Sequence, residues 1–451
     1  MKKRLDVLLI AAPSPNPIMM YAMEIQGMPP LGLGYLATYL KTDNYTVKIV
    51  DLGLANTTIE AVLSVVTNEK PSVIGISCTT ETYTVAVQVA KIIKNTHKEC
   101  AVVLGGPHVS FEYKSALAHS SVDYVVLNEG ENSFKKLCDY CVHGVGTLEK
   151  LKGIAYKRDG VVLCAEPEPF IADLDVLPFP DRNLFEKIND YVHPASISTS
   201  RGCPGTCVFC AASVLSGGKY RMRSPQNIVL EFEYLKSLGF DHVNVIDDTM
   251  TASVERLHGF LDEMISRDLN MTWFCESRVD VMTKDILIKM KAAGLVSIQF
   301  GVESGSQKML DAISKKVKLE QVRNAFIWCK EIGLFAATNI MIGQPEDDSE
   351  TIQNTLSLAE EISSTGAYVS TTVCTPFPGT PLWLHPEKFG IELIDNDLGH
   401  YSTFCPVINT KHLTVAEIRN EYYNVEMELR KKYPKNNYYG NPRKIADLNI
   451  T

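Results

Sequence analysis

Two successive runs of alternating strand and helix patterns constrain the fold of this 451-residue chain more than any other feature. In the first run, residues 5–127, five short stretches are apolar or β-branched throughout, as strands buried on both faces must be. These candidate strands are Val7–Ala11, Thr46–Asp51, Val73–Cys78, Ala101–Leu104 and Tyr124–Leu127, with helical stretches at 31–41, 57–68 and 82–96. The pattern predicts an α/β domain over residues 1–144, built on a doubly wound parallel sheet.

A second alternation begins at residue 195. Its six candidate strands are Ser196–Ser200, His242–Asp247, Thr272–Cys275, Ser297–Gly301, Asn339–Ile342 and Tyr368–Val373, separated by helical stretches at 225–238, 253–267, 283–293, 319–332 and 349–363. Six βα repeats predict a partial (β/α)6 barrel over residues 195–385, short of the eight repeats of a closed barrel. In such barrels the loops that follow the strands carry the chemistry.

Two segments fall outside these alternations. Residues 145–194 include the proline-rich, aperiodic stretch EPEPFIADLDVLPFPDRNLF (166–185), which predicts an extended connector. Residues 386–451 predict a small helical carboxyl-terminal unit. Its helix, 413–433, has Thr414 and Glu417 as a capping box and ends before Pro434.

Charge and hydropathy exclude several classes of function. A formal net charge of −9 and a pI near 5.7 provide no electrostatic footprint for nucleic acid. No apolar run approaches the ~20 residues of a membrane-spanning helix. The amino terminus resembles a signal peptide only briefly, because its apolar run breaks at Pro13, so we expect a buried first strand and a cytoplasmic protein. In that reducing compartment the twelve cysteines are expected to be metal ligands or core residues rather than disulfides.

The stretch SRGCPGTCVFC (200–210), which follows the first barrel strand, places three thiols within eight residues: Cys203, Cys207 and Cys210. Structural zinc takes four protein ligands and a disulfide takes two cysteines, so a group of three cysteines favours neither of them. Three thiolates can bind three irons of a [4Fe–4S] cluster and leave the fourth iron open. The alternatives are a zinc site with a distant fourth ligand, such as Cys275 or His193, or three core thiols.

The spacing Cys-x3-Cys-x2-Cys, with the aromatic Phe209 before the last cysteine, resembles that of the radical S-adenosylmethionine (SAM) superfamily. The resemblance implies that the open iron binds the amino and carboxylate groups of SAM. One electron from the cluster then cleaves a carbon–sulfur bond and releases methionine and a 5′-deoxyadenosyl radical.

Other loops at the ends of barrel strands extend this resemblance. It implies that Asp247 and Asp248 receive the SAM amino group, that Glu303 binds the ribose or methionine moiety, and that Arg278 pairs with the SAM carboxylate. It also implies that the adenine lies beside Phe209 and close to the backbone at Gly343.

The first domain resembles the Rossmann-like domain of the cobalamin-binding radical SAM enzymes, often called class B radical SAM methylases. The matching segments are PPLGLGYLA (29–37), GISCTTETYTVAVQVAKIIK (75–94), VVLGGPHVS (102–110) and VDYVVLNEGE (122–131). The cobalamin-binding positions that the resemblance implies are Ser77, Thr79, Gly105, Gly106, His108, Glu129 and Gly130. The loop at 12–30 has no histidine, so any bound cobalamin would lack the lower histidine ligand of the carbon-skeleton mutases. The alternative is a scaffold domain that does not use cobalamin.

These features together predict a cobalamin-dependent radical SAM methyltransferase acting on an unactivated carbon. The resemblance implies three cofactors, a [4Fe–4S] cluster, SAM and methylcobalamin, and an electron donor such as flavodoxin or ferredoxin. The substrate is expected to be a small molecule or natural-product intermediate, with no class signature in the sequence. Two alternatives stay open: radical SAM chemistry of another kind (dehydration, deoxygenation, cyclisation or carbon–carbon coupling), and a non-catalytic carrier. An auxiliary cluster or a substrate-facing thiol is a further possibility at Cys275, Cys374 and Cys405.

Overall fold

The computed structural model of the chain describes residues 4–16 and 27–434, and contacts divide the chain into two compact units. The first unit groups residues 1–172, 176–194 and 397–399, and the second groups 173–175, 195–396 and 400–451. Most of the predicted connector therefore belongs with the first unit, and most of the predicted carboxyl-terminal unit belongs with the barrel. The boundaries 1–144, 145–194, 195–385 and 386–451 stay predictions, and residues 435–451 of the last one lie outside the described residues.

The first unit is built on a seven-stranded sheet with the strand order β2-β1-β3-β4-β5-β6-β7. Its strands are β1 (Val7–Ala11), β2 (Val47–Asp51), β3 (Val73–Ser77), β4 (Ala101–Gly105), β5 (Tyr124–Val126), β6 (Ile154–Arg158) and β7 (Val161–Cys164). The first five strands pair in parallel, as predicted. The strand order reverses between β1 and β3, and in doubly wound sheets this reversal is where ligands bind, at the carboxyl ends of the strands.

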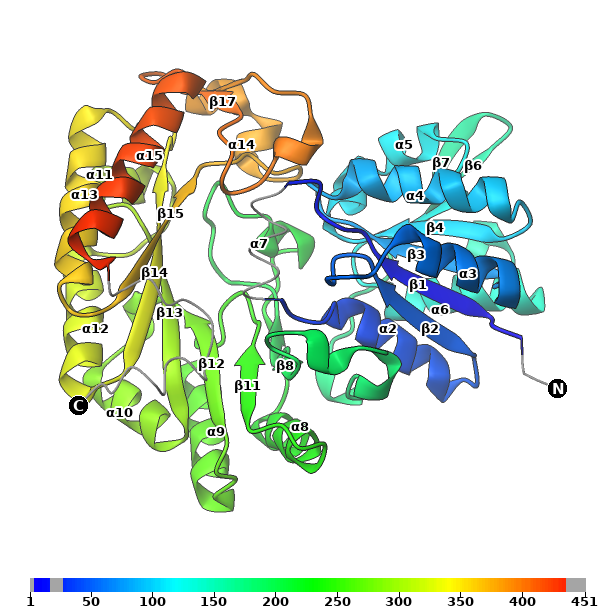
Figure 1. Cartoon of the computed structure of the whole chain (residues 1–451), viewed down its shortest axis with the longest axis horizontal. Helices are drawn as coiled ribbons and strands as arrows, with labels where there is room; N and C mark the ends of the chain where they lie inside the picture. The colour runs from blue at the N-terminus through cyan, green and yellow to red at the C-terminus, as the bar shows by residue number, and fades with distance from the viewer. Residues whose placement is uncertain (1–3, 17–26, 435–451) are drawn as a thin grey trace. The chain divides into compact units, whose positions relative to one another are not determined.

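Helices cover both faces of this sheet, which is why its strands are apolar on both sides (Figure 1). The helices are α2 (Leu31–Thr42), α3 (Ile59–Glu69), α4 (Tyr83–Thr96), α5 (Pro107–Ala118) and α6 (Gly130–His143). On one face, Leu8 and Ile10 of β1 join a core with side chains of α3, α4 and α5. On the other face, Val7 and Leu9 join a core with side chains of α2 and α6. The alternation of neighbouring β1 residues between two cores confirms the doubly wound architecture.

The antiparallel strands β6 and β7 form a hairpin inside residues 145–194, which the sequence pattern predicted to be an extended connector. The turn between them is Asp159–Gly160, and both residues have positive φ, at 51° and 80°. An Asp-Gly pair between two β-branched runs is a strong hairpin signal, so this element was readable from the sequence.

The second unit contains a six-stranded parallel sheet with the strand order β15-β14-β13-β12-β11-β8. Its strands are β8 (Ser196–Ile197), β11 (His242–Val245), β12 (Thr272–Ser277), β13 (Leu295–Glu303), β14 (Phe335–Ile342) and β15 (Tyr368–Val373). Each strand pairs with the next one along the chain, and the sheet ends at β8 and β15, so the predicted partial (β/α)6 barrel is confirmed. Short antiparallel pairs, β9 (Ser200–Arg201) with β10 (Arg221–Met222) and β16 (Glu392–Leu393) with β17 (Ile408–Asn409), supplement the sheet.

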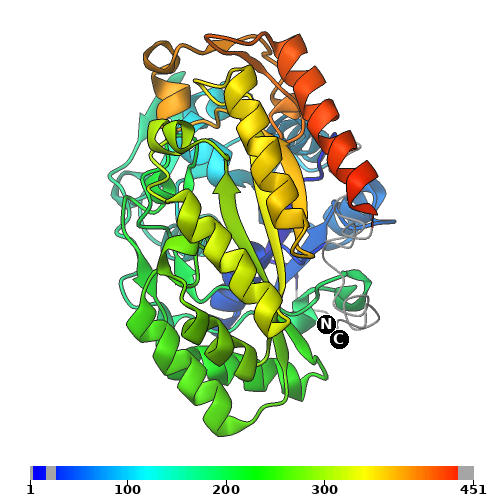
Figure 2. The ribbon, with the colours of Figure 1, turned by 90° about the vertical axis from the view of Figure 1, so that its left-hand side faces the viewer.

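The helices of this unit are α7 (Ala212–Leu215), α8 (Pro225–Ser237), α9 (Val254–Arg267), α10 (Lys284–Ala292), α11 (Gln307–Ala312), α12 (Leu319–Ile332), α13 (Ser349–Ser363), α14 (Pro381–Leu384) and α15 (Val415–Lys432). The last of them, α15, begins at the predicted capping box of Thr414 and Glu417 and packs against α13 and β15 (Figure 2). No helix of the described residues is long and apolar enough to cross a membrane.

Candidate radical-initiation and cofactor sites

The cysteine loop leaves the barrel at the carboxyl end of β8 and returns through a two-stranded ladder. Ser200 pairs with Met222 and Arg201 with Arg221, so the loop that holds the three thiols is closed at its base. Gly202 sits inside this base with φ at 88°, and a Cβ there would lie 2.3 Å from the carbonyl oxygen of Lys219. The left-handed backbone and the close approach together require glycine at this position.

The sulfur atoms of Cys203 and Cys207 face the same small residue of the loop. A Cβ built on Gly205 would lie 3.3 Å from the first sulfur and 3.9 Å from the second, and the Gly205 N–H donates to Cys203 Sγ at 3.3 Å. Burial raises the pKa of Cys207, and it raises the pKa of Cys210 to about 11. The thiol of Cys210 therefore ionises only well above neutral pH unless a cation offsets its burial.

Two cations lie beside these thiols. Lys315 and Arg278 both act to lower the pKa of Cys207, against the larger effect of burial. The ammonium of Lys315 lies 2.7 Å from the carboxylate of Glu303, and both side chains are largely buried. Arg278 donates to both oxygens of Asp280 at 2.9 Å and to the carbonyl of Lys315, also at 2.9 Å. The structure thus places the predicted residues Arg278 and Glu303 near the cysteine loop. It also adds Lys315, which follows α11 and which no sequence motif singled out.

The two acidic residues after β11 have different surroundings. Asp247 is buried, and it accepts hydrogen bonds from the Thr199 N–H at 2.6 Å, from the Thr199 hydroxyl and from Ser200 Oγ at 2.6 Å. Asp248 is exposed; desolvation first and Asp247 second raise its pKa, while the Gly202 N–H lowers it. Of the two predicted SAM-amino ligands, only Asp248 therefore presents a carboxylate that protein donors do not already occupy on both oxygens.

Glu276, near the end of β12, lies close to the carboxylates of Asp248 and Glu303, although no sequence motif predicted a role for it. Its pKa is raised to about 7, first by desolvation and then by the carboxylates Asp248 and Glu303, while Lys315 lowers it. These carboxylates come together only because the ends of three strands meet in the folded protein. The residues next to Glu276 in the sequence therefore gave no indication that it lies near this site.

The surroundings of Phe209 and Gly343, the two residues predicted to lie near the adenine, do not by themselves indicate a ligand. Phe209 is half-buried in the cysteine loop. Gly343 follows β14 with φ at 78°, and a Cβ there would lie 2.7 Å from the side chain of Ile418 in α15. The structure therefore explains Gly343 by its backbone conformation and by close packing of α15, and its role toward SAM stays a prediction.

In the first unit, several predicted cobalamin-binding residues meet at the carboxyl ends of β3 and β4. Ser77 is the last residue of β3 and Gly105 the last of β4, and the two are register partners. Gly106 has φ at 106°, and a Cβ there would lie 2.5 Å from the carbonyl oxygen of Cys78 and 3.2 Å from Ser77 Oγ. This position requires glycine because the two strand ends approach each other so closely.

His108, in the first turn of α5, is buried beneath these strand ends. Its Nδ1 lies 3.3 Å from Thr80 Oγ1, its ring centroid lies 4.3 Å from that of Tyr83, and its Nε2 has no hydrogen-bond partner among the described residues. Burial lowers the pKa of His108 to about 4, so the imidazole is neutral at physiological pH. A buried ring nitrogen without a partner is a group that a ligand can satisfy.

The other predicted cobalamin-binding residues, Thr79, Glu129 and Gly130, make contacts with neighbouring parts of the first unit. Thr79 is exposed and makes a turn with Thr82, whose hydroxyl accepts from the Thr79 N–H at 2.9 Å. Glu129 accepts from the Ile171 N–H at 3.0 Å. A Cβ on Gly130 would lie 3.0 Å from Leu36, so this glycine lets α6 approach α2. For Glu129 and Gly130 the structure shows architectural roles, and their part in cobalamin binding stays a prediction.

Among residues 4–16 and 27–434, no group of three or more His, Cys, Asp and Glu side chains is arranged to hold a metal ion. The assignment of Cys203, Cys207 and Cys210 to a cluster stays a prediction. Cys275, inside β12, and Cys374, directly after β15, are buried, and burial raises the pKa of each strongly. Cys405 is half-buried.

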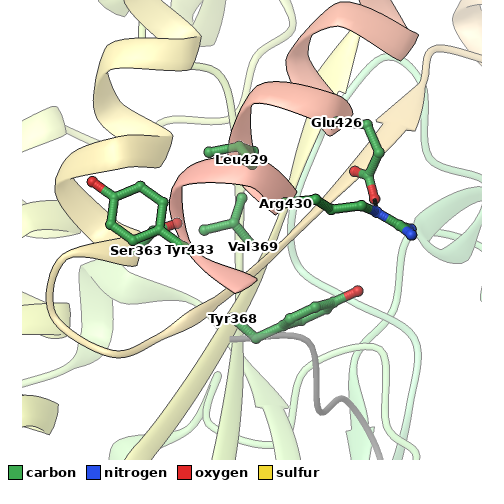
Figure 3. Close-up of a pocket in the computed structure, with 7 residues that line it drawn as sticks. All are labelled: Ser363, Tyr368, Val369, Glu426, Leu429, Arg430 and Tyr433. Atoms are coloured by element: carbon green, nitrogen blue, oxygen red, sulfur yellow. Dashed lines mark hydrogen bonds and ion pairs between the residues drawn. The ribbon is translucent and has the colours of Figure 1, made fainter. Parts of the chain in front are cut away.

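A small, open pocket lies elsewhere on the second unit, between α13, β15 and α15 (Figure 3). Arg430 lies across it with its Nε 2.6 Å from Glu426. The lining residues are Ser363, Tyr368, Val369, Glu426, Leu429, Arg430 and Tyr433. Because Tyr368 is the first residue of β15, this pocket lies at the amino end of that strand and is separate from the cysteine loop.

Comparison with known proteins identifies both units. Residues 26–138 match the family of the B12 binding domain, and residues 197–359 match the radical SAM superfamily. The chain is 32% identical to "Uncharacterized methyltransferase PH0819" of Pyrococcus horikoshii, over 92% of this chain and 90% of the relative. This chain belongs to the radical SAM superfamily, among the members with a B12 binding domain. As a radical SAM enzyme it has the predicted cofactors: a [4Fe–4S] cluster, SAM and cobalamin.

Two further comparisons place this radical SAM enzyme among its relatives. It is 29% identical to the anaerobic magnesium-protoporphyrin IX monomethyl ester cyclase of Rubrivivax gelatinosus, over 88% of this chain and 72% of the relative. Its fold is similar to that of the radical SAM methyltransferase TsrM from Kitasatospora setae, solved with cobalamin and a [4Fe–4S] cluster bound. That comparison has a TM-score of 0.73 and 16% identity, and it covers 93% of this chain and 82% of TsrM.

Proposed function

We propose that this enzyme is a cobalamin-dependent methyltransferase that methylates an unactivated carbon of a small-molecule substrate. The observation that carries the proposal is the 32% identity, over nine-tenths of both chains, to a protein named as a methyltransferase. Its two domain matches supply the two cofactor classes that such a reaction needs. When bound, the cluster with SAM supplies radical initiation, and cobalamin supplies the methyl carrier.

The residues of the cysteine loop fit the cluster. Thiolate is the normal ligand of iron–sulfur clusters, and Cys203, Cys207 and Cys210 are separate thiols on one loop. Lys315 and Arg278 lower the pKa of Cys207, so the protein supplies positive charge where thiolates have to form. Gly205 leaves open space next to two of the sulfur atoms, which a larger residue would fill.

The charged side chains around this loop fit the methionine part of SAM, which carries one ammonium and one carboxylate. In this proposal Asp248 and Glu303 receive the ammonium, and Lys315 and Arg278 receive the carboxylate. Glu276, whose pKa of about 7 leaves it partly protonated at neutral pH, faces the same region and can donate or accept a hydrogen bond. These side chains hold and orient SAM and exclude water from the reacting carbon.

The carboxyl ends of β3 and β4 fit a large polar ligand such as cobalamin. Gly106 keeps the strand ends open where a Cβ would clash, and His108 offers a buried ring nitrogen that has no hydrogen-bond partner within residues 4–16 and 27–434. Thr79 adds an exposed hydroxyl at the same edge. We propose that these residues hold cobalamin by hydrogen bonds to its polar substituents. We also propose that an electron donor such as ferredoxin or flavodoxin reduces the cluster.

The experiment uses the full chain, purified anaerobically and supplied with iron, sulfide, cobalamin, SAM and dithionite. The expected products without any substrate are 5′-deoxyadenosine from reductive cleavage and S-adenosylhomocysteine from methyl transfer. S-adenosylhomocysteine should require cobalamin. With the true substrate, one of each should form per methyl group transferred. Formation of 5′-deoxyadenosine without S-adenosylhomocysteine, with or without cobalamin, would contradict methyl transfer.

Radical cyclisation is the second candidate, because the chain is 29% identical to a cyclase over 88% of its length. A cyclisation consumes SAM only to start the radical and transfers no methyl group. It would therefore give the result just described as contradicting the methyltransferase, which makes the two candidates distinguishable in one assay.

A further inference from the structure

The backbone that leads into the cysteine loop is held by a buried ionic network. Thr199, Asp247 and Arg256 are exposed by 0%, 3% and 7%, respectively. The Thr199 hydroxyl donates to Asp247, and the same oxygen accepts from Arg256 Nη1 at 2.9 Å. The buried guanidinium and the buried carboxylate are thus joined through one hydroxyl group, four residues before Cys203.

The network also fixes the main chain at this point. Asp247 accepts from the Thr199 N–H at 2.6 Å and from Ser200 Oγ at 2.6 Å. Arg256 Nη1 donates to the Thr199 carbonyl at 2.9 Å, and its Nη2 donates to the Met250 carbonyl at 2.5 Å. Three of these bonds tie Thr199 or Ser200 to α9 or to the loop after β11, and the fourth ties α9 to that loop.

A second buried guanidinium holds the preceding residue. Arg223 donates to the carbonyl of Ser198 at 2.9 Å and forms an ion pair with Glu231, which is fully buried. Because β8 ends at Ile197, the carbonyls of Ser198 and Thr199 lie beyond its parallel pairing, and the Arg223 N–H donates to the Thr199 carbonyl at 3.0 Å. The side chains of two arginines, Arg223 just before α8 and Arg256 in α9, therefore donate to consecutive carbonyls at the entrance of the cysteine loop.

We propose that Arg256, Thr199 and Asp247 are positioning residues. They hold the cysteine loop so that its thiols face Asp248, Glu303 and Lys315 at the distance that cluster-bound SAM requires. This inference rests on the proposed function, but it assigns Asp247 a role through Thr199 in place of direct contact with SAM. A buried network of this kind is cooperative, so losing the central hydroxyl weakens all of its bonds.

The test compares Thr199→Val, which is nearly isosteric and removes only the hydroxyl, with Thr199→Ser, which keeps it. Arg256→Met and Arg256→Lys form a second pair. The matched controls are Thr371→Val, a buried threonine whose hydroxyl has no hydrogen-bond partner among the described residues, and Arg267→Met, at the end of the same helix α9. Thermal unfolding of each apoprotein identifies any variant that fails to fold, and the Thr199 pair then carries the test.

The first readout is amide hydrogen exchange in the apoprotein, which needs no cofactor. Thr199→Val should speed exchange in residues 199–222 by about tenfold, while Thr199→Ser and Thr371→Val should match the wild type. The second readout is the electron paramagnetic resonance spectrum of the reduced cluster with and without SAM. Thr199→Val and Arg256→Met should keep their iron but raise the SAM concentration that changes the spectrum by about tenfold.

Unchanged exchange in residues 199–222 and an unchanged SAM response in both variants would overturn the positioning role. A wild-type protein that binds no cluster, or a cluster whose spectrum ignores SAM, would instead contradict the proposed function. The exchange measurement then still decides whether the network holds the loop.

Discussion

Lys315 and Glu303 form a largely buried ion pair, with the ammonium 2.7 Å from the carboxylate, next to the thiol of Cys207. Breaking such a pair leaves one charge unpaired, so Lys315→Met should lower the free energy of unfolding by about 3 kcal/mol. The double variant with Glu303→Gln should recover most of this loss. Urea unfolding of the apoproteins measures it, with Lys284→Met as the control for an exposed pair, expected within about 0.5 kcal/mol of the wild type. Equal losses in the single and double variants would show that the pair is not the source.

Substitution of Gly202 and of Gly106 should impair the two proposed cofactor sites independently of each other. Gly202→Ala forces a Cβ to 2.3 Å from the Lys219 carbonyl, so the variant should lose most of its reconstituted iron and its SAM cleavage but bind cobalamin as before. Gly106→Ala forces a Cβ to 2.5 Å from the Cys78 carbonyl and should do the reverse. Iron analysis and retention of cobalamin on gel filtration measure both. Gly32→Ala, within helix α2, where nothing lies within 4 Å of a Cβ, is the control. Loss of both cofactors in either variant would indicate general unfolding instead.

His108 should make the protein sensitive to acid. Its pKa is lowered to about 4 in the fold against an ordinary value of 6.5, so the folded protein resists protonating it. The stability that neutral His108 provides is complete above pH 6.5 and is lost as the pH falls toward 4, by about 3 kcal/mol in total. His108→Gln should flatten this part of the pH profile of urea unfolding, whereas His119→Gln, at an exposed histidine, should not. Parallel profiles for wild type and His108→Gln would rule out this linkage.

The thiol of Cys210 should react slowly in the apoprotein. With its pKa at about 11, its thiolate fraction and its rate of alkylation by iodoacetamide should rise about tenfold per pH unit between pH 7 and pH 10. Peptide mass spectrometry after short exposures measures this rate, with the exposed Cys164 as an internal reference that reacts faster. Reconstitution with iron and sulfide should then protect Cys203, Cys207 and Cys210 but not Cys164. Equal modification of all four before and after reconstitution would argue against a cluster on this loop.

Most of the architecture was predictable because it depends on local pattern. The five predicted strands of the first domain and the six of the barrel are short apolar runs that a parallel sheet buries on both faces. Their positions therefore follow from the local sequence pattern alone. The capping box of Thr414 and Glu417 is equally local. The hairpin of β6 and β7 was not predicted although Asp159–Gly160 is a local turn signal, because the proline-rich residues 166–185 directly after it favour an extended connector.

The sequence by itself determined that three thiols lie together on one short loop, because three cysteines within eight residues are a local feature that no packing can rearrange. Only the tertiary structure decided what surrounds them. Lys315 and Glu276 carry no motif, and they come near the thiols because parallel strands end at one edge of a sheet. The neighbours Asp247 and Asp248 are equivalent in the sequence, yet the Thr199 donors bury one carboxylate and leave the other exposed. Burial and partners depend on residues distant in the chain, which is why the sequence alone did not distinguish the two.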